Sequence, residues 1–391
     1  MKPFTFLRNT APLTSTAPFT SLFSLLSLLV LIVMAPSCGH PSSKDGKSSV
    51  HYWKGVDIGW CTEMEARGLK LYDREGNEME CTALMKSLGC DAIRIRVWVD
   101  PTAHGGWCSV EDVLEKARRA KANGMAVMVD FHYSDFWADP NKQNIPASWS
   151  GKTYEEVKEL LYAHTVDVLS ALRAEGIEPL WVQVGNETSH GLLWSVKGNE
   201  WGDPIPDENG KVTILESQGR LETQARQYAG FIDRGYEAVK SVFPDAKVIV
   251  HLDNGFNPDL YDSNLDSLKK YGARWDMTGM SMYPYWAIQS GLETDPDESI
   301  THCIENISHV WGKYSTPVMI VETGFVVDES DPSVMAEGER LLGRLITESR
   351  SLGEACQGIF YWEPECRPSQ YRLGAFDSRG YPTVIMNAFS K

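Results

Sequence analysis

The chain has 391 residues, a formal net charge of −16 and many aromatic side chains, including 13 Trp and 15 Tyr. The negative charge makes nucleic acid and anionic polymers poor partners but is compatible with a neutral polymer. Part of the aromatic content belongs to a core, and aromatic rings are also the platforms on which sugar rings stack.

The first fifty residues do not resemble a folded domain. Residues 21–34 form an apolar segment that is short for a membrane span and has the length of an export-signal core. The following Ala35-Pro36-Ser37-Cys38 is similar to the lipobox of bacterial lipoproteins, in which the cysteine becomes the lipidated N-terminus. We therefore expect a lipoprotein signal peptide at residues 1–37, lipidation at Cys38 and a flexible tether at residues 38–50. The protein would be exported and lipid-anchored to the outer membrane at the cell surface; a plain secretory signal, with a periplasmic or secreted protein, is the alternative.

Eight short apolar runs, each of the length of a buried strand, follow one another along the rest of the chain. They cover residues 53–60, 92–99, 125–131, 180–184, 247–252, 277–282, 318–321 and 358–361. Segments with helical periodicity lie between runs at residues 110–123, 154–175, 221–243 and 335–352, and a Gly or Pro follows each of them. Strands that alternate with helices in this way form a parallel sheet with right-handed crossovers.

The eightfold alternation predicts a closed (β/α)8 TIM barrel, an α/β fold that occupies residues 51–391 as a single domain. The roughly 340 residues after the tether fit one such barrel with insertions. An open, doubly wound sheet would need a glycine-rich phosphate loop after its first strand, and Gly59-Trp60-Cys61-Thr62-Glu63 is not such a loop.

Active sites of parallel barrels lie at the C-terminal ends of the strands, so the residues at the end of each run are the candidate site residues. Strand ends with only a structural role would show mostly Gly, Pro, Asn and Ser. Here the candidates are instead polar, charged or aromatic: Trp60, Arg96, Trp98, Asp130, His132, Asp135, Asn186, Glu187, His251, Asp253, Tyr283, Glu322, Trp362 and Glu363.

Two of these candidates, Glu187 and Glu322, are glutamates that closely follow apolar runs. Either one alone is more simply read as a solvated residue after an ordinary strand. As a pair on opposite sides of a barrel mouth, they match what glycosidic-bond cleavage requires: one carboxyl protonates the leaving oxygen and the other attacks the anomeric carbon or activates water. A carboxyl separation of roughly 5–5.5 Å would support retention of configuration, and roughly 6.5–9.5 Å would support inversion.

The acid of such a pair needs a raised pKa, whereas the nucleophile needs cationic or hydrogen-bonding neighbours. Arg96 points inward on the second strand and is the candidate to support the nucleophile. Arg94 has the same parity but lies deeper, and we interpret it as a member of a core ion pair. Tyr283 is expected to donate its hydroxyl to the nucleophile, and Asn186 to hydrogen-bond the sugar 2-hydroxyl.

Aromatic residues near the same strand ends are candidates for sugar contacts. Trp362 is expected to form the apolar floor beneath the reacting sugar, with a barrel-core tryptophan as the alternative. Glu363 precedes Pro364 and is interpreted as sugar-binding at most. The long polar and aromatic segment at residues 131–149 has no helical periodicity, and loops of this length usually carry function. Its Trp137 and Trp149 would each either stack on a sugar or pin the loop to the barrel.

Seven cysteines remain when Cys38 is set aside, so at least one is free if the others pair. No Cys-x-x-Cys or Cys/His cluster indicates zinc, and we expect no metal site from these residues. Export would permit disulfides. A Cys61–Cys108 bond would be plausible if both residues lay on loops at the active-site face, but the sequence does not fix the pairing.

Together these motifs resemble glycoside hydrolase family 53, the endo-β-1,4-galactanases, over about residues 53–382. The most particular stretches are His132-Tyr133-Ser134-Asp135 with Trp137-Ala138-Asp139-Pro140, and Tyr361-Trp362-Glu363-Pro364. Less specific matches are Gly55-Val56-Asp57-Ile58, Arg94-Ile95-Arg96-Val97-Trp98, Gln183-Val184-Gly185-Asn186-Glu187, Ser281-Met282-Tyr283-Pro284 and Glu322-Thr323-Gly324.

The resemblance implies a single catalytic (β/α)8 domain and a retaining mechanism, with Glu187 as acid/base and Glu322 as nucleophile. It implies cleavage of internal linkages in β-1,4-galactan with release of galacto-oligosaccharides, by an enzyme that we expect to be a monomer with no required cofactor. Some bacterial members hold calcium near the last two strands; here Asp328, Glu329 and Asp331 are either a cation site or a solvated acidic turn before a helix. A mannanase or cellulase of the same mechanism, and a glycan-binding protein on an inactive scaffold, are the alternatives.

Overall fold

The computed structural model describes residues 50–390. The expected signal peptide, the lipidation site Cys38 and nearly all of the expected tether lie outside the described residues and stay predictions. Within residues 50–390, no helix is both long and apolar enough to cross a membrane.

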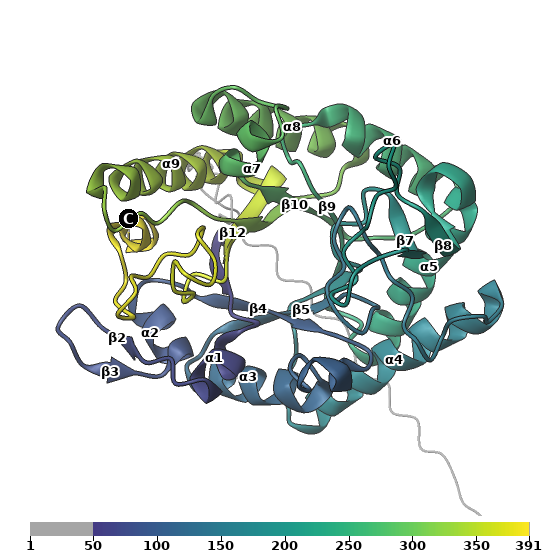
Figure 1. The fold of residues 1–391 in the computed structure, drawn as a ribbon, viewed down its shortest axis with the longest axis horizontal. Coiled ribbons are helices and arrows are strands. Elements are labelled where there is room, and N and C mark those ends of the chain that lie inside the picture. Colours follow the sequence, from purple (N-terminus) through teal and green to yellow (C-terminus); the bar gives the residue numbers. More distant parts are fainter. Residues whose placement is uncertain (1–49, 391) are drawn as a thin grey trace, which may run out of the picture. The chain divides into compact units, whose positions relative to one another are not determined.

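Eight parallel strands close into a barrel in the order β1-β12-β11-β10-β9-β6-β5-β4 (Figure 1). Each of them falls on one of the eight apolar runs of the sequence, so the predicted (β/α)8 TIM barrel is confirmed. The strands are β1 (Trp53–Asp57), β4 (Ala92–Val97), β5 (Ala126–Phe131), β6 (Trp181–Val184), β9 (Lys247–Leu252), β10 (Met277–Met282), β11 (Val318–Thr323) and β12 (Cys356–Trp362).

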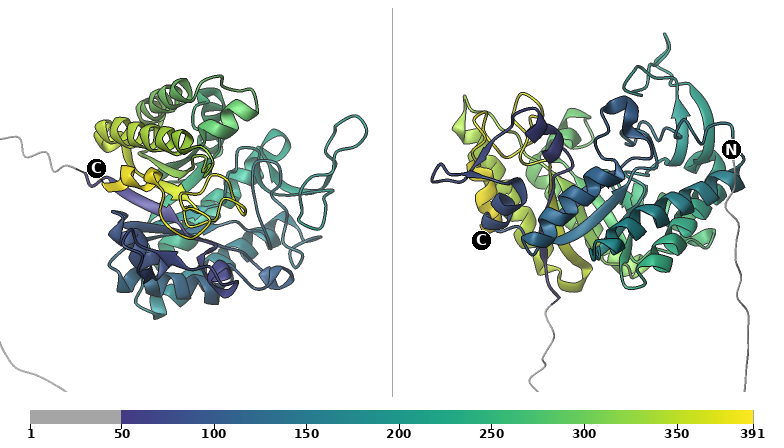
Figure 2. Two further views of the ribbon diagram at one scale, coloured as in Figure 1. Left: turned by 60° about the vertical axis from the view of Figure 1, so that its left-hand side comes forward. Right: turned by 90° about the horizontal axis from the view of Figure 1, so that it is seen from below.

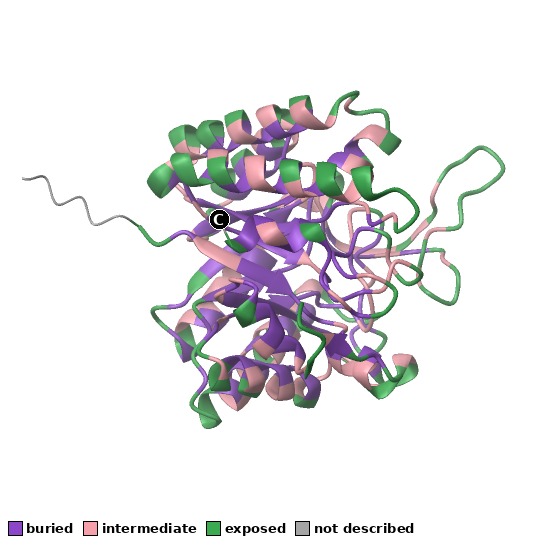
Figure 3. Ribbon diagram, turned by 90° about the vertical axis from the view of Figure 1, so that its left-hand side faces the viewer, coloured by how far each residue is buried: buried purple, intermediate pink, exposed green. Residues whose placement is uncertain are grey.

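Helices surround the barrel, and their barrel-facing sides are buried while their outer sides are exposed (Figure 3). The four predicted helices are present with ends within three residues of the expected ones: α3 (Val110–Ala122), α4 (Tyr154–Ala174), α5 (Leu221–Val242) and α9 (Pro332–Ser351). The others are α1 (Cys61–Ala66), α2 (Cys81–Ser87), α6 (Pro258–Lys270), α7 (Pro284–Gln289), α8 (Pro296–Tyr314) and the 3₁₀ turns η1 (Pro101–His104), η2 (Gly353–Ala355) and η3 (Val384–Ser390).

Two antiparallel hairpins are added to the barrel. The first joins β2 (Leu71–Tyr72) to β3 (Glu78–Met79), and the second joins β7 (Gly191–Val196) to β8 (Ile214–Arg220). The β7–β8 hairpin lies between β6 and α5, where the sequence predicted only a connection, and the loop at its tip projects outward (Figure 2). The long segment after β5 contains no helix before α4, as expected.

The barrel interior changes from apolar to charged along the strands, and this gradient positions the site. On β4, Ala92, Arg94 and Arg96 alternate with the outward-packed Ile93 and Ile95, as the two-residue period of a strand requires. The lower layer is an apolar cluster of Ala92, Met128, Trp181, Ile249, Met277, Met319, Val321 and Phe360. The polar groups therefore collect at the C-terminal ends of the strands.

A β-bulge places Glu322 in this polar layer. Simple alternation along β11 would put Met319 and Val321 inside the barrel and Glu322 outside. The register between β10 and β11 shifts, however, so that Met280 pairs with Ile320 and Ser281 with Glu322. A bulge re-aims the following side chain, and Glu322 consequently enters the barrel mouth.

The cysteine prediction needs a correction. All seven cysteines in the described part of the chain are free and buried. Cys61 and Cys108 do not form a disulfide, and the Cys108 thiol faces the carbonyl of Gly59 at 4.0 Å. Burial raises the pKa of the Cys108 thiol, so this group is a neutral core residue.

Candidate active site

A cavity of about 870 Å³ opens at the C-terminal ends of the strands. It contains both glutamates and most of the residues that the sequence singled out. The predicted residues among its walls are Arg96, Asp130, His132, Trp137, Asn186, Glu187, Asp253, Tyr283, Glu322 and Trp362. Asp135, His251 and Glu363 do not line it.

Glu322 is held by one cation and one hydroxyl. Arg94 Nη1 donates to Oε1 at 2.8 Å and the Tyr283 hydroxyl donates to Oε2 at 3.0 Å, so the hydroxyl contact expected for Tyr283 is confirmed. Burial and the nearby carboxylates of Asp57 and Asp130 raise the pKa of Glu322 to about 7, while Arg94 and Tyr283 oppose this rise by favouring the ionised carboxylate. The two donors leave Glu322 as the carboxylate prepared to carry a negative charge.

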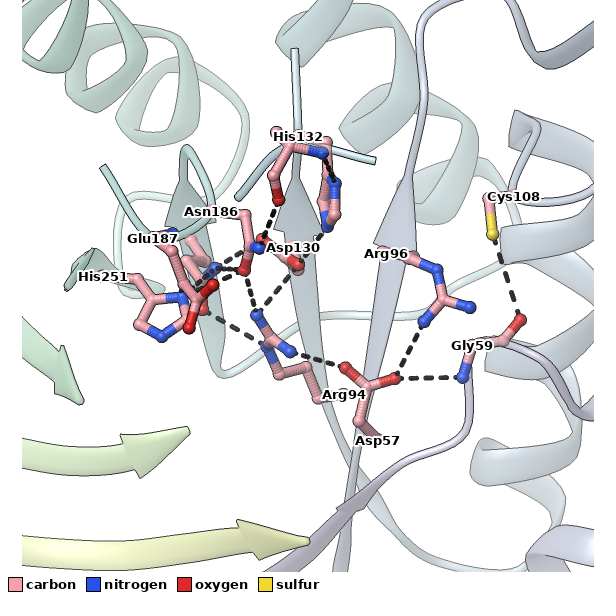
Figure 4. A network of polar contacts seen from close by, with 12 residues as sticks. Asp57, Gly59, Arg94, Arg96, Cys108, Asp130, His132, Asn186, Glu187 and His251 are labelled. Carbon is pink, nitrogen blue, oxygen red and sulfur yellow. Dashed lines mark hydrogen bonds and ion pairs between the residues drawn. The ribbon is translucent and has the colours of Figure 1, made fainter. Parts of the chain in front are cut away.

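Arg94, not Arg96, makes this contact, so the role predicted for Arg96 is wrong. Arg94 is the buried ion-pair member that was predicted, and in addition it supports the nucleophile candidate. The Arg94 guanidinium also donates to Asp57 at 2.6 Å, Asp130 at 2.9 Å and the Asn186 amide oxygen at 2.8 Å (Figure 4). Its depth on β4 was read correctly. However, two residues along a strand correspond to a rise of only about 6.6 Å. An extended arginine side chain is long enough to span this distance, so Arg94 reaches Glu322 from its deeper position.

Arg96 is paired elsewhere, with a residue that was predicted to touch sugar. Its guanidinium donates to Glu363, which is fully buried and also accepts the backbone N–H of Trp60 at 3.1 Å. Glu363 therefore holds Arg96 and the chain after β1 in place, and its predicted role in sugar binding is wrong. The Trp137 ring covers Arg96 at 4.1 Å from the guanidinium carbon, a cation–π contact that places this ring in the cavity wall.

Glu187 has a different environment. Ser281 donates its hydroxyl to Glu187 Oε1 at 2.6 Å, and the serine oxygen lies 2.8 Å from His251 Nε2. Within residues 50–390, no lysine or arginine forms an ion pair with Glu187. Burial and the nearby carboxylates of Glu322 and Asp253 raise the pKa of Glu187 well above its usual range. This environment favours the protonated carboxylic acid.

The backbone at Glu187 is also unusual. Glu187 has a φ of +46°, in the left-handed region that non-glycine residues seldom adopt. The neighbouring Thr188 fixes it there, because its N–H donates to the His251 carbonyl at 2.8 Å and its hydroxyl lies 2.8 Å from that of Tyr228. Strained residues of this kind cluster at functional sites.

His251 acts through Glu187 and does not face the cavity. Its Nδ1 lies 3.3 Å from the Glu187 backbone nitrogen and 3.0 Å from the Asn186 amide oxygen, and its Nε2 lies 2.8 Å from the Ser281 hydroxyl. Burial and the charge of Arg94 lower the pKa of His251 well below its usual value, so the ring stays neutral. The predicted site role of His251 is thus indirect.

Four other candidates differ in their positions. His132 Nε2 lies 3.0 Å from Asp130, and both side chains line the cavity. Trp362 lines it as well, with its ring 5.8 Å from that of Trp137. Asp135 instead accepts the N–H groups of Asp100 and Ala147, so its predicted role in the site is corrected to one of loop structure.

Two further expectations concern Asn186 and Trp149. The Asn186 amide nitrogen donates to the Ala138 carbonyl at 2.8 Å, and its contact with a sugar hydroxyl stays a prediction. Trp149 is buried and packs against His164. Of its two predicted roles, the structure therefore supports attachment of the loop to the barrel and not stacking on a sugar. Trp137, in contrast, is available to a ligand.

Some site residues were missed by the sequence analysis. Ser281 and Gln183 have the inward parity of Arg94 on their own strands, but neither residue type stands out in a sequence. Gln183 accepts from Arg94 at 3.3 Å and donates to Asp130, and Ser281 reaches Glu187. Asp139 and Lys142 line the cavity from the loop after β5.

The acidic turn after β11 was considered for calcium. Asp331 accepts the N–H of Ser333 at 3.0 Å as the N-cap of α9, and Asp328 accepts the N–H of Ser330 at 2.9 Å. These carboxylates are engaged with the backbone, and no group of three or more potential ligands among residues 50–390 is arranged around a metal position. The residues present do not fit the ion.

Comparison with known proteins assigns the family. The sequence model of glycosyl hydrolase family 53 matches residues 53–384. The chain belongs to this family. A family 53 catalytic domain from Ignisphaera aggregans superposes with a TM-score of 0.72 at 26% identity, covering 90% of this chain and 99% of that domain. A structure of fungal β-1,4-galactanases gives a TM-score of 0.73 at 24% identity, covering 87% of this chain and 99% of that one, and supports the fold.

Sequence relatives agree with the family assignment. An uncharacterized protein from Niallia circulans is 30% identical over 335 residues, which are 81% of this chain and 84% of that protein. An endo-β-1,4-galactanase from Bacillus subtilis is 27% identical over 81% of this chain and 70% of its own length. An arabinogalactan endo-β-1,4-galactanase from Thermothelomyces thermophilus is 28% identical over 80% of this chain and 89% of that enzyme. The family 53 chain is therefore a glycoside hydrolase.

Proposed function

We propose that this protein is an endo-β-1,4-galactanase that cleaves type I (arabino)galactan with retention of configuration and releases galacto-oligosaccharides. The observation that carries the catalytic part is the unequal surroundings of two glutamates in one cavity. Glu322 accepts from the cation Arg94 and from Tyr283, whereas Glu187 accepts from a neutral serine in place of a cation. One carboxyl is thus prepared to be ionised and the other to be protonated.

In the first step, Glu322 attacks the anomeric carbon while the bond from that carbon to the leaving oxygen breaks. Glu187 transfers its proton to this oxygen, so the shortened chain departs as a neutral alcohol and Glu187 becomes a carboxylate. Arg94 and Tyr283 hold the Glu322 carboxylate in a fixed orientation for attack. The product of this step is a glycosyl ester on Glu322.

In the second step, the Glu187 carboxylate removes a proton from water as the water oxygen attacks the anomeric carbon. The ester bond breaks, Glu322 returns as a carboxylate and Glu187 returns as an acid. While Glu322 is an uncharged ester, Glu187 can stay ionised and act as the base. As the ester bond breaks and Glu322 regains its negative charge, the proton taken up by Glu187 avoids repulsion between the two carboxylates. Two displacements at one carbon give net retention.

The substrate is proposed from the relatives and from the charge of the chain. Two relatives that align over most of this chain are galactanases. A net charge of −16 suits a neutral polysaccharide. The wide, aromatic-lined cavity suits internal binding to a polymer, with Trp362 as the proposed floor beneath the reacting sugar.

The test is product analysis on linear β-1,4-galactan, with mannan and carboxymethylcellulose in parallel and Glu322→Ala as the inactive control. A ladder of short galacto-oligosaccharides from galactan alone is the expected result. Cleavage of mannan or carboxymethylcellulose but not galactan would retain the two glutamates and reject the substrate. If no polymer is cut but galactan is bound, the protein is a glycan-binding protein.

A further inference from the structure

A second cavity, of about 510 Å³, adjoins the active-site cavity. Trp137 lines both, so the two cavities meet at this side chain. The second cavity is walled mainly by aromatic rings, which come from the loops after β1, β4 and β5 and from the β7–β8 hairpin. They are Trp60, Trp98, Trp107, Phe136, Trp137 and Trp201.

Trp201 is the most exposed of these rings, with 53% of its surface accessible, yet its backbone is firmly held. Its N–H donates to the Asn199 side chain at 2.8 Å, and its carbonyl accepts from Lys142 Nζ at 3.3 Å. Lys142 is itself buried and forms an ion pair with Asp203, in the same turn. The turn thus keeps a large apolar ring in solvent at a fixed place.

The rings around Trp201 form a continuous aromatic wall. The Trp201 ring lies 6.0 Å from that of Phe136, and His104 stacks on Phe136 at 3.8 Å. Polar groups lie at the edge of the same cavity, among them Gln370 and the Glu63–Arg67 ion pair at 2.6 Å. Flat apolar faces with a few polar groups at the rim suit the C–H face and the hydroxyls of a hexose.

The position of the second cavity relative to Glu187 gives the direction of the bound chain. Gly59 and Cys108, the neighbours of Trp60 and Trp107, lie on the other side of Arg96 from Glu187 (Figure 4). Because Glu187 protonates the leaving oxygen, the leaving part of the polysaccharide is on its own side. The second cavity is therefore on the side of the sugar that forms the ester.

We propose that this cavity binds further hexose units of the same polysaccharide chain, on the non-reducing side of the cleaved bond, with Trp201 as a stacking platform. The inference rests on the galactanase function proposed above and adds an extended binding region that depends on the β7–β8 hairpin. Longer substrates would gain contacts there that short ones cannot reach.

The experiment compares kcat/KM for galacto-oligosaccharides from trisaccharide to hexasaccharide in the wild type and in Trp201→Ala. We expect the variant to lose roughly threefold to tenfold on the longest substrate and little on the trisaccharide. Trp201→Phe should keep most of the length dependence. Ile205→Ala is the matched control, since Ile205 lies on the same loop, is 48% exposed and does not line the cavity.

Equal losses on short and long substrates, or no loss on any, would overturn this inference while the galactanase function stands. A loss of the same size in Ile205→Ala would also overturn it, because the effect would then belong to the loop and not to the ring. Failure of the wild type to cleave any galactan substrate would instead reject the proposed function, and the inference with it.

Discussion

Removal of one hydroxyl, in Tyr283→Phe, tests the proposed division of roles between the two glutamates. The hydroxyl donates to Glu322 Oε2 at 3.0 Å and so stabilises the ionised form of this carboxyl. Hydrogen bonds to charged groups contribute about 1.5–3 kcal/mol. Since about 1.4 kcal/mol corresponds to one pH unit, the pKa of Glu322 should rise by roughly one to two units in the variant.

The direction of the pH effect follows from the role of Glu322. The nucleophile must be ionised, so kcat/KM falls at low pH as Glu322 takes up a proton. A higher pKa moves this acidic limb to higher pH, by the same one to two units. At pH values below the acidic limb, kcat/KM of the variant should therefore be about 10-fold to 100-fold lower than that of the wild type. At the plateau the loss should be smaller, because the negative charge that Tyr283 stabilises disappears when Glu322 attacks the sugar.

The assay is the pH dependence of kcat/KM on a soluble galacto-oligosaccharide, which reports ionisations of the free enzyme. Tyr371→Phe is the matched control: Tyr371 also lines the cavity but makes no hydrogen bond to either glutamate, so the limb should stay in place. An active Tyr283→Phe enzyme whose acidic limb coincides with that of the wild type would refute the reasoning. If only the basic limb moved, Tyr283 would be acting on the catalytic acid. The roles assigned to Glu187 and Glu322 would then have to be exchanged.

Four further predictions follow from the same contacts and from the N-terminal motif. Ser281→Ala removes the hydroxyl that favours ionised Glu187, so its pKa and the basic limb of kcat/KM should move to higher pH. Glu187→Ala should slow substrates with poor leaving groups far more than activated aryl glycosides, and equal losses would contradict its acid role. Arg94→Met should lower the free energy of unfolding by about 3–5 kcal/mol in chemical denaturation, because it leaves carboxylates buried without a cation. Cys38→Ala should abolish incorporation of labelled fatty acid in a bacterial host and move the protein from the membrane to the soluble fraction; labelling that persists would disprove the anchor.

Much of the fold was predictable because each barrel strand has a simple apolar signal. Strand ends in a barrel also share one face, so Glu187 and Glu322 could be placed together without knowledge of any contact. The β7–β8 hairpin was not predictable in this way. Only β8 is largely polar. β7 is an apolar run, but β8 follows it without a helical segment in between, so the pair falls outside the strand–helix alternation that marks the barrel strands.

The fine structure of the site depended on side-chain reach and backbone conformation, which a sequence does not display. Glu363 follows a strand as Glu187 does and has the same φ of +46°, yet it is buried against Arg96. One partial signal was present at Gly59. A Cβ at this position would lie 2.2 Å from Arg96 Nη1, so only glycine lets the arginine lie where Glu363 can bind it.

Arg94 connects the two halves of the proposed mechanism. It contacts Asp57 at the end of β1, Asp130 on β5, Asn186 after β6 and Glu322 on β11. A buried group of charges contributes little stability compared with a well-packed apolar core. Its value here is geometric, since one rigid guanidinium fixes the nucleophile and the residue next to the acid relative to each other. A retaining mechanism needs one carboxyl at the anomeric carbon and the other at the leaving oxygen of the same bond, so a single guanidinium that contacts Glu322 and Asn186 suits the proposed mechanism.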